Sequence, residues 1–169
     1  PSGAMTHTSA QWTKIAAPGG AFQDGGRIDD PTATSTNGGK WYAYPHIAVN
    51  AAGDFIVGYS QLSSAQHPAA GYSIHLAADA AGTIRDPQIY HAGEDYYHKT
   101  FSTATGRNRW GDFSTAQVDP SDDMTLWTLQ EYAKTRTGTD DGNTGSNSSR
   151  WSSWWAGVTF ATNYTITAS

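Results

Sequence analysis

The chain has 169 residues, enough for one domain with a hydrophobic core, and its formal net charge is −5. It contains no cysteine and no cluster of Lys or Arg, which excludes disulfides and thiol catalysis and argues against a nucleic-acid partner. Charged residues make up 15% of the chain, below the roughly 25% of an average globular protein, and aromatic residues make up 12%. With 18 glycines as well, this composition predicts an all-β protein with many turns.

Alternating apolar and polar residues, separated by Gly, Pro and Asp, predict up to nine strands and no long helix. The turns AAGD and DPSDD have the residue types that hairpin connections need. Residues 134–149 form a long polar stretch that predicts a loop, and residues 162–169 are a further strand candidate. The strand-like runs lie, in chain order, at 11–17, 21–23, 41–50, 55–63, 71–78, 84–93, 110–118, 124–133 and 150–161.

Two of these hairpins resemble each other, at residues 44–61 and 111–132. In each, the first strand ends in Val followed by Asn or Asp, the turn holds Gly or Asp, and a third strand-like run follows. A meander that repeats in this way predicts the blades of a β-propeller. We therefore expect two blade-like repeats, at about 41–93 and 107–160.

The segments GGRIDDPTATSTNGGKWYAYPHIAVNAAGDFIVGYSQ and RNRWGDFSTAQVDPSDDMTLWTLQEYA resemble sialidase-like, BNR-type β-propeller repeats of uncharacterised bacterial extracellular proteins. The resemblance runs over about Gln11–Gly157. It implies antiparallel four-stranded blades and a bacterial protein. The Asp-box pattern of such repeats is incomplete here, because VDPSDDMTLW has the Asp and Trp127 but no turn Gly.

The length of the chain covers two to three blades, whereas a propeller needs at least four. Three arrangements therefore remain open: a piece of a longer propeller, a homo-oligomer in which several chains close one ring, or a compact β-sandwich.

The first five residues, PSGAM, are interpreted as a cloning remnant, which leaves residues 6–169 as a single all-β domain. No apolar stretch reaches the length of a bilayer span, so we expect no membrane partner, and no signal peptide is recognisable. The family resemblance predicts an extracellular or secreted protein, with the cytoplasm as the alternative.

Charged residues gather in the segment RNRWGD and in the strand that follows it. Arg binds carboxylates through two parallel hydrogen bonds, and the resemblance implies that clustered Arg would hold an acidic sugar. A structural pair of Arg109 with Asp112 is the alternative. Glu131 could activate a Tyr from elsewhere, because its neighbour Tyr132 points to the other face of the strand. The candidate catalytic residues are Arg107, Arg109, Asp112 and Glu131.

Tryptophans supply the candidate ligand-binding residues: Trp110, Trp151, Trp154 and Trp155. Aromatic rings can stack on sugars, but in a strand Trp151 and Trp155 share one face while Trp154 takes the other. Since one face should be core, at most one side is expected to be a platform, and burial between blades is the alternative.

No cofactor is evident from the sequence, apart from possible calcium. Oxygen ligands of the kind that Ca²⁺ prefers are offered by three residues that stand near glycines, Asp140, Asp141 and Asn143. The alternative is a flexible surface loop that binds no metal. Asp29 and Asp30 are a second Ca²⁺ candidate. A mixed metal site is also conceivable, and its ligands would be His91, Glu94, Asp95 and His98.

The function predicted from these features is a non-catalytic binding or scaffold surface for a glycan or a protein. The alternative is a fragment of a sialidase-like glycoside hydrolase that uses the carboxylates and Arg residues named above.

Overall fold

The computed structural model describes residues 6–34, 36, 38–99, 108–138 and 148–160, and these contain strands but no helix. The predicted all-β class is therefore confirmed for the described residues. Accordingly, no helix in this part of the chain is long and apolar enough to span a bilayer. The strands are β1 Ala10–Ile15, β2 Phe22–Ile28, β3 Trp41–Val49, β4 Phe55–Ser63, β5 Gln66–His75, β6 Gln88–His91, β7 Thr115–Val118, β8 Leu126–Lys134 and β9 Arg150–Val158.

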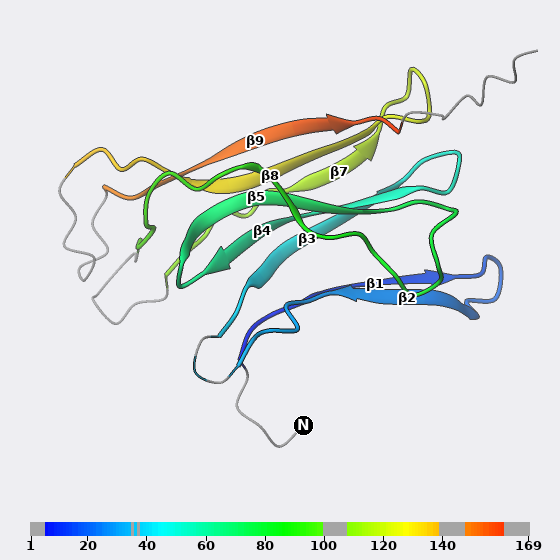
Figure 1. The fold of residues 1–169 in the computed structure, drawn as a ribbon. Coiled ribbons are helices and arrows are strands. Elements are labelled where there is room, and N and C mark those ends of the chain that lie inside the picture. The colour runs from blue at the N-terminus through cyan, green and yellow to red at the C-terminus, as the bar shows by residue number, and fades with distance from the viewer. Residues whose placement is uncertain (1–5, 35, 37, 100–107, 139–147, 161–169) are drawn as a thin grey trace, which may run out of the picture.

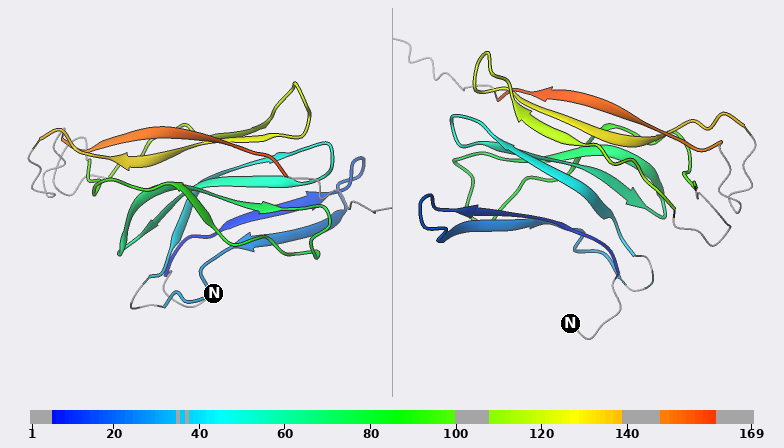
Figure 2. Two further views of the ribbon diagram at one scale, coloured as in Figure 1. Left: turned by 45° about the horizontal axis from the view of Figure 1, so that its top comes forward. Right: turned by 180° about the vertical axis from the view of Figure 1, so that it is seen from behind.

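The strands form three antiparallel sheets, with the orders β1-β2, β3-β4-β5-β6 and β7-β8-β9. Figure 1 shows the sheets as stacked layers, with the four-stranded sheet in the middle, and the two views of Figure 2 show the same order of layers. Each sheet follows the chain order without a crossover, so strands that are consecutive in the chain lie side by side within a sheet. The chain is thus a series of meanders packed face to face.

Two apolar clusters hold the layers together, one on each face of the middle sheet. Trp12 from β1 packs against Phe55 on β4, with ring centroids 4.8 Å apart, in the cluster that joins the two-stranded sheet to the middle sheet. Ile56, the next residue of β4, points the other way and packs with Leu126 of β8. Alternate residues of one strand therefore serve both layers, which explains why β4 is buried almost without interruption.

Strand β2 is longer than the sequence predicts, since it runs on through the glycines to Ile28 rather than ending at residue 23. Pairing with β1 extends it, from Ile15 opposite Phe22 to Ala10 opposite Ile28. A Cβ at Gly26 would overlap the indole of Trp12, so glycine is needed there for close packing.

The turns β3–β4 and β7–β8 share one hydrogen-bond pattern, which matches the predicted likeness of the two hairpins. Asn50 and Asp119 each donate their N–H to a carbonyl across the hairpin, and each accepts, at side-chain Oδ1, the N–H of the residue two positions later. The partners are Asp54 O (2.9 Å) and Ala52 N (3.0 Å) for Asn50, and Thr125 O (2.8 Å) and Ser121 N (2.9 Å) for Asp119.

Each of these turns also has one left-handed residue, Gly53 with φ 86° and Asp123 with φ 54°. Asp123 therefore takes the conformation for which a turn glycine was missing in the sequence pattern, and Asp tolerates it better than most residues. The two turns lie against each other, because Ala51 N donates to Asp123 O (3.0 Å) and Asn50 Nδ2 donates to Met124 O (3.1 Å).

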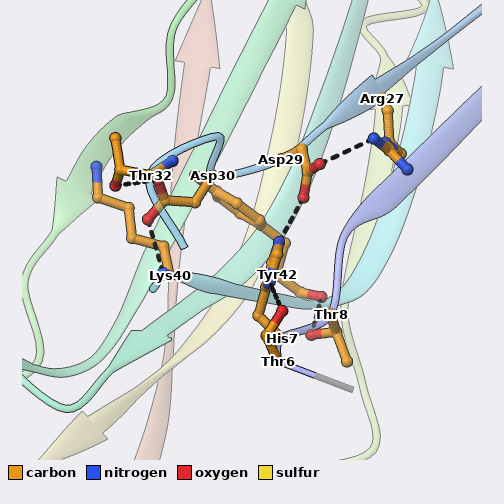
Figure 3. A network of polar contacts seen from close by, with 9 residues as sticks. All are labelled: Thr6, His7, Thr8, Arg27, Asp29, Asp30, Thr32, Lys40 and Tyr42. Carbon is orange, nitrogen blue, oxygen red and sulfur yellow. Dashed lines mark hydrogen bonds and ion pairs between the residues drawn. The ribbon is translucent and has the colours of Figure 1, made fainter. Parts of the chain in front are cut away.

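A network of polar contacts links the residues before β1 to the two-stranded sheet and to the four-stranded sheet (Figure 3). His7 Nε2 lies 2.6 Å from Asp29 Oδ1, and Arg27 Nη2 lies 3.0 Å from Asp29 Oδ2. Thr8 and Tyr42 exchange two hydrogen bonds, from Tyr42 N to Thr8 O (3.1 Å) and from Thr8 Oγ1 to Tyr42 O (2.9 Å). Asp29 thus serves as an anchor for the N-terminal segment.

Candidate functional site

The segment before β7 carries the charged residues that the sequence singles out. It lies beside residues 97–99, because Arg109 N donates to Lys99 O (3.0 Å) and Lys99 N donates to Asn108 Oδ1 (2.7 Å). These two bonds hold residues 97–99 beside residues 108–109, and we call these two stretches, which have no regular secondary structure, the rim. Arg109 and Lys99 are thereby brought to the same place.

A cavity of about 350 Å³ opens at this rim. It brings together cations, one carboxylate and several aromatic rings from three parts of the chain. The lining residues are Tyr97, Lys99, Arg109, Trp110, Gly111, Asp112, Phe113 and Trp151.

A second cavity, of about 610 Å³, shares Tyr97 and Trp110 with the first. The rings of these two residues meet edge to face at 4.9 Å, and Trp110 Nε1 donates to Ser60 Oγ (3.3 Å). The second cavity is lined by Thr8, Trp41, Ala43, Tyr44, Leu62, Ser63, Pro68, Tyr97, Asn108 and Trp110. We call the two cavities together the aromatic cleft; its aromatic residues are Trp41, Tyr44, Tyr97, Trp110, Phe113 and Trp151.

Tyr44, in the wall of the second cavity, has a strained backbone, with φ of 54° directly before a proline. The pairing of β3 with β4 is irregular here, between Ala43 and His46. Ser114 Oγ lies 2.8 Å from His46 Nδ1 and donates to Tyr44 O (3.1 Å), which pins the irregular stretch to the segment before β7. Strain of this kind is kept where the surroundings enforce it, often at functional sites.

Glu131 lies behind the cleft and does not line it. Its side chain is 1% exposed, and a Cβ at Gly111 would overlap its carboxylate, so the backbone of Gly111 covers it directly. Phe113 N donates to Oε1 at 3.2 Å. Burial raises the pKa of Glu131, the hydrogen bond from Phe113 opposes that rise, and the charge of Asp112 adds to it.

The pKa of Tyr97 is influenced by the charge of Glu131. Burial raises the pKa of Tyr97 to about 12, the carboxylate of Glu131 adds to the rise, and Arg150 opposes it. The phenol therefore stays protonated at neutral pH and can act as a hydrogen-bond donor in the cleft. Tyr132, next to Glu131 in the chain, instead packs on His91 with ring centroids 3.9 Å apart.

Of the site residues predicted from the sequence, four line one cavity in the structure: Arg109, Trp110, Asp112 and Trp151. Glu131 is their neighbour but is sealed off, and Arg107 lies outside the described residues. Trp154 and Trp155 line neither cavity of the cleft.

The expected burial of one tryptophan face of the last strand is wrong for this chain. Trp151, Trp154 and Trp155 are 41%, 48% and 64% exposed. The reason is that β9 is the edge strand of an outer sheet. Trp155 lies on the outer face beside Trp127, at 5.1 Å between ring centroids, and Trp154 lies beside His91 at the end of the short strand β6, at 4.4 Å.

The candidate calcium ligands Asp140, Asp141 and Asn143 lie outside the described residues. Within the residues that the structure describes, no group of three or more His, Asp or Glu side chains is arranged to bind a metal ion. The mixed site does not assemble: Glu94 Oε2 accepts Thr135 N (3.0 Å), and Asp95 pairs with Arg136 Nε (3.4 Å). Asp29 and Asp30 likewise bind protein partners, His7 and Thr32 among them.

Several cleft residues were not predicted from the sequence, namely Trp41, Tyr44, Tyr97 and Lys99. Trp41 and Tyr44 are part of a strand-like aromatic run, and nothing in that run distinguishes an exposed ring from a buried one. Only the irregular pairing at Ala43–His46 turns Tyr44 outward. The Tyr-Pro pair marks this position, since proline weakens regular strand pairing.

Comparison of the chain with family models, with curated proteins and with solved structures finds no match.

Proposed function

We propose that this chain is a non-catalytic carbohydrate-binding module of propeller-like architecture, which binds a glycan in the aromatic cleft. The observation that carries the proposal is that rings lining the cleft remain open to solvent: Trp41 is 38% exposed, Tyr44 45%, Trp151 41% and Phe113 77%. Exposed rings around one concave surface are unusual unless a ligand covers them.

The two halves of the cleft have different chemistry, and both suit a sugar. The larger cavity offers ring faces for the C–H face of a pyranose, with Trp41, Tyr44 and Trp110 among its walls. The smaller cavity adds groups that bind hydroxyls, such as Lys99, Arg109 and Asp112. Stacking would supply affinity, and the polar groups would orient the ligand.

Binding without turnover is favoured because the lining of the cleft holds a single carboxylate among the described residues, that of Asp112. Hydrolysis of a glycoside commonly needs two carboxyl groups facing the bond, or a tyrosine nucleophile with its own activating carboxylate. Glu131, the nearest further carboxylate, is buried behind Gly111 and has no access to a bound sugar.

A sialidase-like glycoside hydrolase is the second candidate, and one observation favours it. The carboxylate of Glu131 acts electrostatically on Tyr97, and the phenol of Tyr97 lines both cavities. A movement of Gly111 would be needed before Glu131 could activate that phenol.

Glycan-array screening followed by titration calorimetry tests the binding proposal. Trp41→Ala and Tyr44→Ala should each weaken binding of the glycan found by about tenfold, the effect of losing one stacking contact. Phe22→Ala is the matched control, because Phe22 is exposed but lies on the two-stranded sheet away from the cleft. Absence of glycan binding, or an equal loss in the control, would contradict the proposal.

Fluorogenic glycosides, sialosides among them, separate the two candidates. We expect no turnover by the protein. Turnover that disappears in Glu131→Gln while glycan binding persists would instead support the hydrolase.

The resemblance to extracellular propeller repeats and the stack of antiparallel meanders support a secreted module of this architecture. Calcium bound by Asp140, Asp141 and Asn143 stays part of the proposal as a structural ion.

A further inference from the structure

Strand β9 is a long edge strand with little of the protection that other edges of this molecule have. Within the described residues it pairs with β8 alone, over nine residue pairs and without a register shift. It contains no proline, and its one charged residue is Arg150 at the first position. By contrast, the edge strand β3 has Pro45 and an irregular register, and β6 and β7 have four residues each.

The free edge of β9 presents the backbone groups of its odd-numbered residues. Thr125 O accepts a hydrogen bond from Asp119 across the β7–β8 hairpin, so the odd positions of β8 turn their backbone groups toward β7. The even positions of β8 then face β9, where Gln130 stands opposite Trp154. By alternation, the N–H and C=O groups of Trp151, Ser153 and Trp155 point away from the sheet.

We propose that β9 is a homodimer interface, in which the strand pairs antiparallel with β9 of a second copy about a two-fold axis through Ser153. In this register Ser153 stands opposite Ser153 of the other copy, and Trp151 stands opposite Trp155. Residues with outward backbone groups then face each other throughout, which is what an antiparallel ladder requires. The two three-stranded sheets become one continuous six-stranded sheet.

The side chains of β9 are self-complementary in this register. Trp151 and Trp155 lie on the outer face, and the two-fold axis produces two cross-strand tryptophan pairs from them. On the other face, the small side chain of Ser152 stands opposite Trp154 and leaves room for its ring. Arg150 stands opposite Ala156, so the pairing places no two like charges against each other.

A second copy of the chain is favoured over other partners because the strand is complementary to itself in both backbone and side chains. The pairing also extends the cleft. Trp151 lines its smaller cavity, and the second copy would place Trp155 beside it. The dimer does not depend on what the cleft binds.

Sedimentation velocity and a cysteine cross-link test the dimer. The chain has no cysteine, so Ser153→Cys introduces a unique thiol close to its own symmetry mate, at about 5.5 Å between Cα atoms. A short bifunctional thiol reagent should convert this variant to a covalent dimer. Thr159→Cys is the control, since Thr159 is exposed but would lie roughly 40 Å from its symmetry mate.

Ser153→Pro removes the central N–H from the free edge and leaves the pairing with β8 intact, whereas Ser153→Ala keeps that N–H. The proline variant should dissociate at least about tenfold more readily than the alanine variant, and Trp155→Lys should also be monomeric. Near-ultraviolet circular dichroism verifies that each variant is folded. A monomeric wild-type protein without cross-linking at position 153, or a dimer that persists in Ser153→Pro, would overturn the proposal.

Discussion

Glu131 and Gly111 show how one glycine decides the character of a carboxylate. A side chain at position 111 would overlap the carboxylate of Glu131, and without one the backbone closes over it. Glu131 is therefore buried, and its pKa is raised. The sequence predicts Glu131 as a candidate catalytic residue on a strand, whereas its burial follows from a neighbour 20 positions earlier in the chain.

The substitution Gly111→Ala should destabilise the protein by about 1–3 kcal/mol, the usual cost of forcing extra atoms into a packed site. Urea unfolding measures this loss. Asp112→Ala is the control, because Asp112 is exposed and its removal should change the free energy of unfolding by less than about 0.5 kcal/mol. Equal effects of the two substitutions would mean that residue 111 is not closely packed.

The variant Glu131→Gln should remove a pH-dependent loss of stability. The folded state holds the Glu131 proton more tightly than the unfolded chain, in which the pKa lies near 4.5. As the pH rises from below 4.5 through the raised pKa, the unfolded state releases its proton first, and the free energy of unfolding falls. Gln cannot ionise, so the variant should gain stability over wild type across this window and differ little below it.

Unfolding curves measured at several pH values test this sign. Asp79 contributes in the opposite direction, because its hydrogen bond from Arg85 lowers the pKa of Asp79 to about 2, and this stabilisation is lost on acidification. The difference between variant and wild type cancels that contribution. A difference that grows toward acid pH would refute the prediction.

At the scale of elements, the two hairpin turns are the most regular feature that the molecule repeats. Asn50 is 6% exposed, and its side chain makes hydrogen bonds to both turns. It accepts a hydrogen bond from Ala52 N within its own turn and donates one to Met124 O in the other. Such a side chain couples the β3–β4 hairpin to the β7–β8 hairpin.

Asn50→Ala should therefore cost about 2–4 kcal/mol, because backbone groups in two turns, the buried Asp54 N among them, lose their hydrogen-bond partner. Ser121→Ala is a matched control in the second turn, where the hydroxyl binds only Asp119 within an exposed loop, and we expect a change below about 0.5 kcal/mol. Chemical denaturation monitored by tryptophan fluorescence compares them. If the Asn50 variant were no less stable than the control, the turns would not act as a coupled unit.

The sequence predicts the strands well where polar and apolar residues alternate between turn residues. The hairpin of β3 and β4 and the strand β8 agree with the expected runs within a few residues. Prediction fails at β2, where glycines read as loop, and at the last strand, where the exposure of three tryptophans depends on which strands lie beside β9. Pairing and layer order are long-range properties that local patterns do not contain.

At the scale of the whole molecule, Trp12 joins the two-stranded sheet to the rest. Its ring packs on Phe55 and lies 5.6 Å from His75, so that one side chain bridges two layers. A two-stranded sheet is marginal by itself and depends on such packing.

Trp12→Ala should cost about 3–5 kcal/mol and should free β1 and β2 selectively. Ile15→Ala, on the same strand but 60% exposed, is expected to have little effect. Hydrogen exchange read by mass spectrometry should show faster exchange in residues 10–28 of the Trp12 variant than in β4 or β8. Uniform acceleration over all strands would indicate instead that the molecule unfolds as one unit.

The candidate site was predicted in part. Arg109, Trp110, Asp112 and Trp151 stand in two separate polar and aromatic segments, and residue chemistry alone drew attention to them. Tyr97 and Lys99 come from a stretch that reads as an ordinary polar loop, and they reach the cleft through two hydrogen bonds to residues 108 and 109.

The sequence by itself determined that this protein is built of antiparallel strands, and that two of its hairpins have equivalent turns, because alternation and turn residues are local signals. Only the tertiary structure decided which side chains are accessible. Glu131 is withdrawn behind Gly111, while Trp41 and Tyr44 are turned into the cleft. The reason is that burial depends on what packs against a residue from elsewhere in the chain, and a strand pattern distinguishes two faces without saying which of them will be covered.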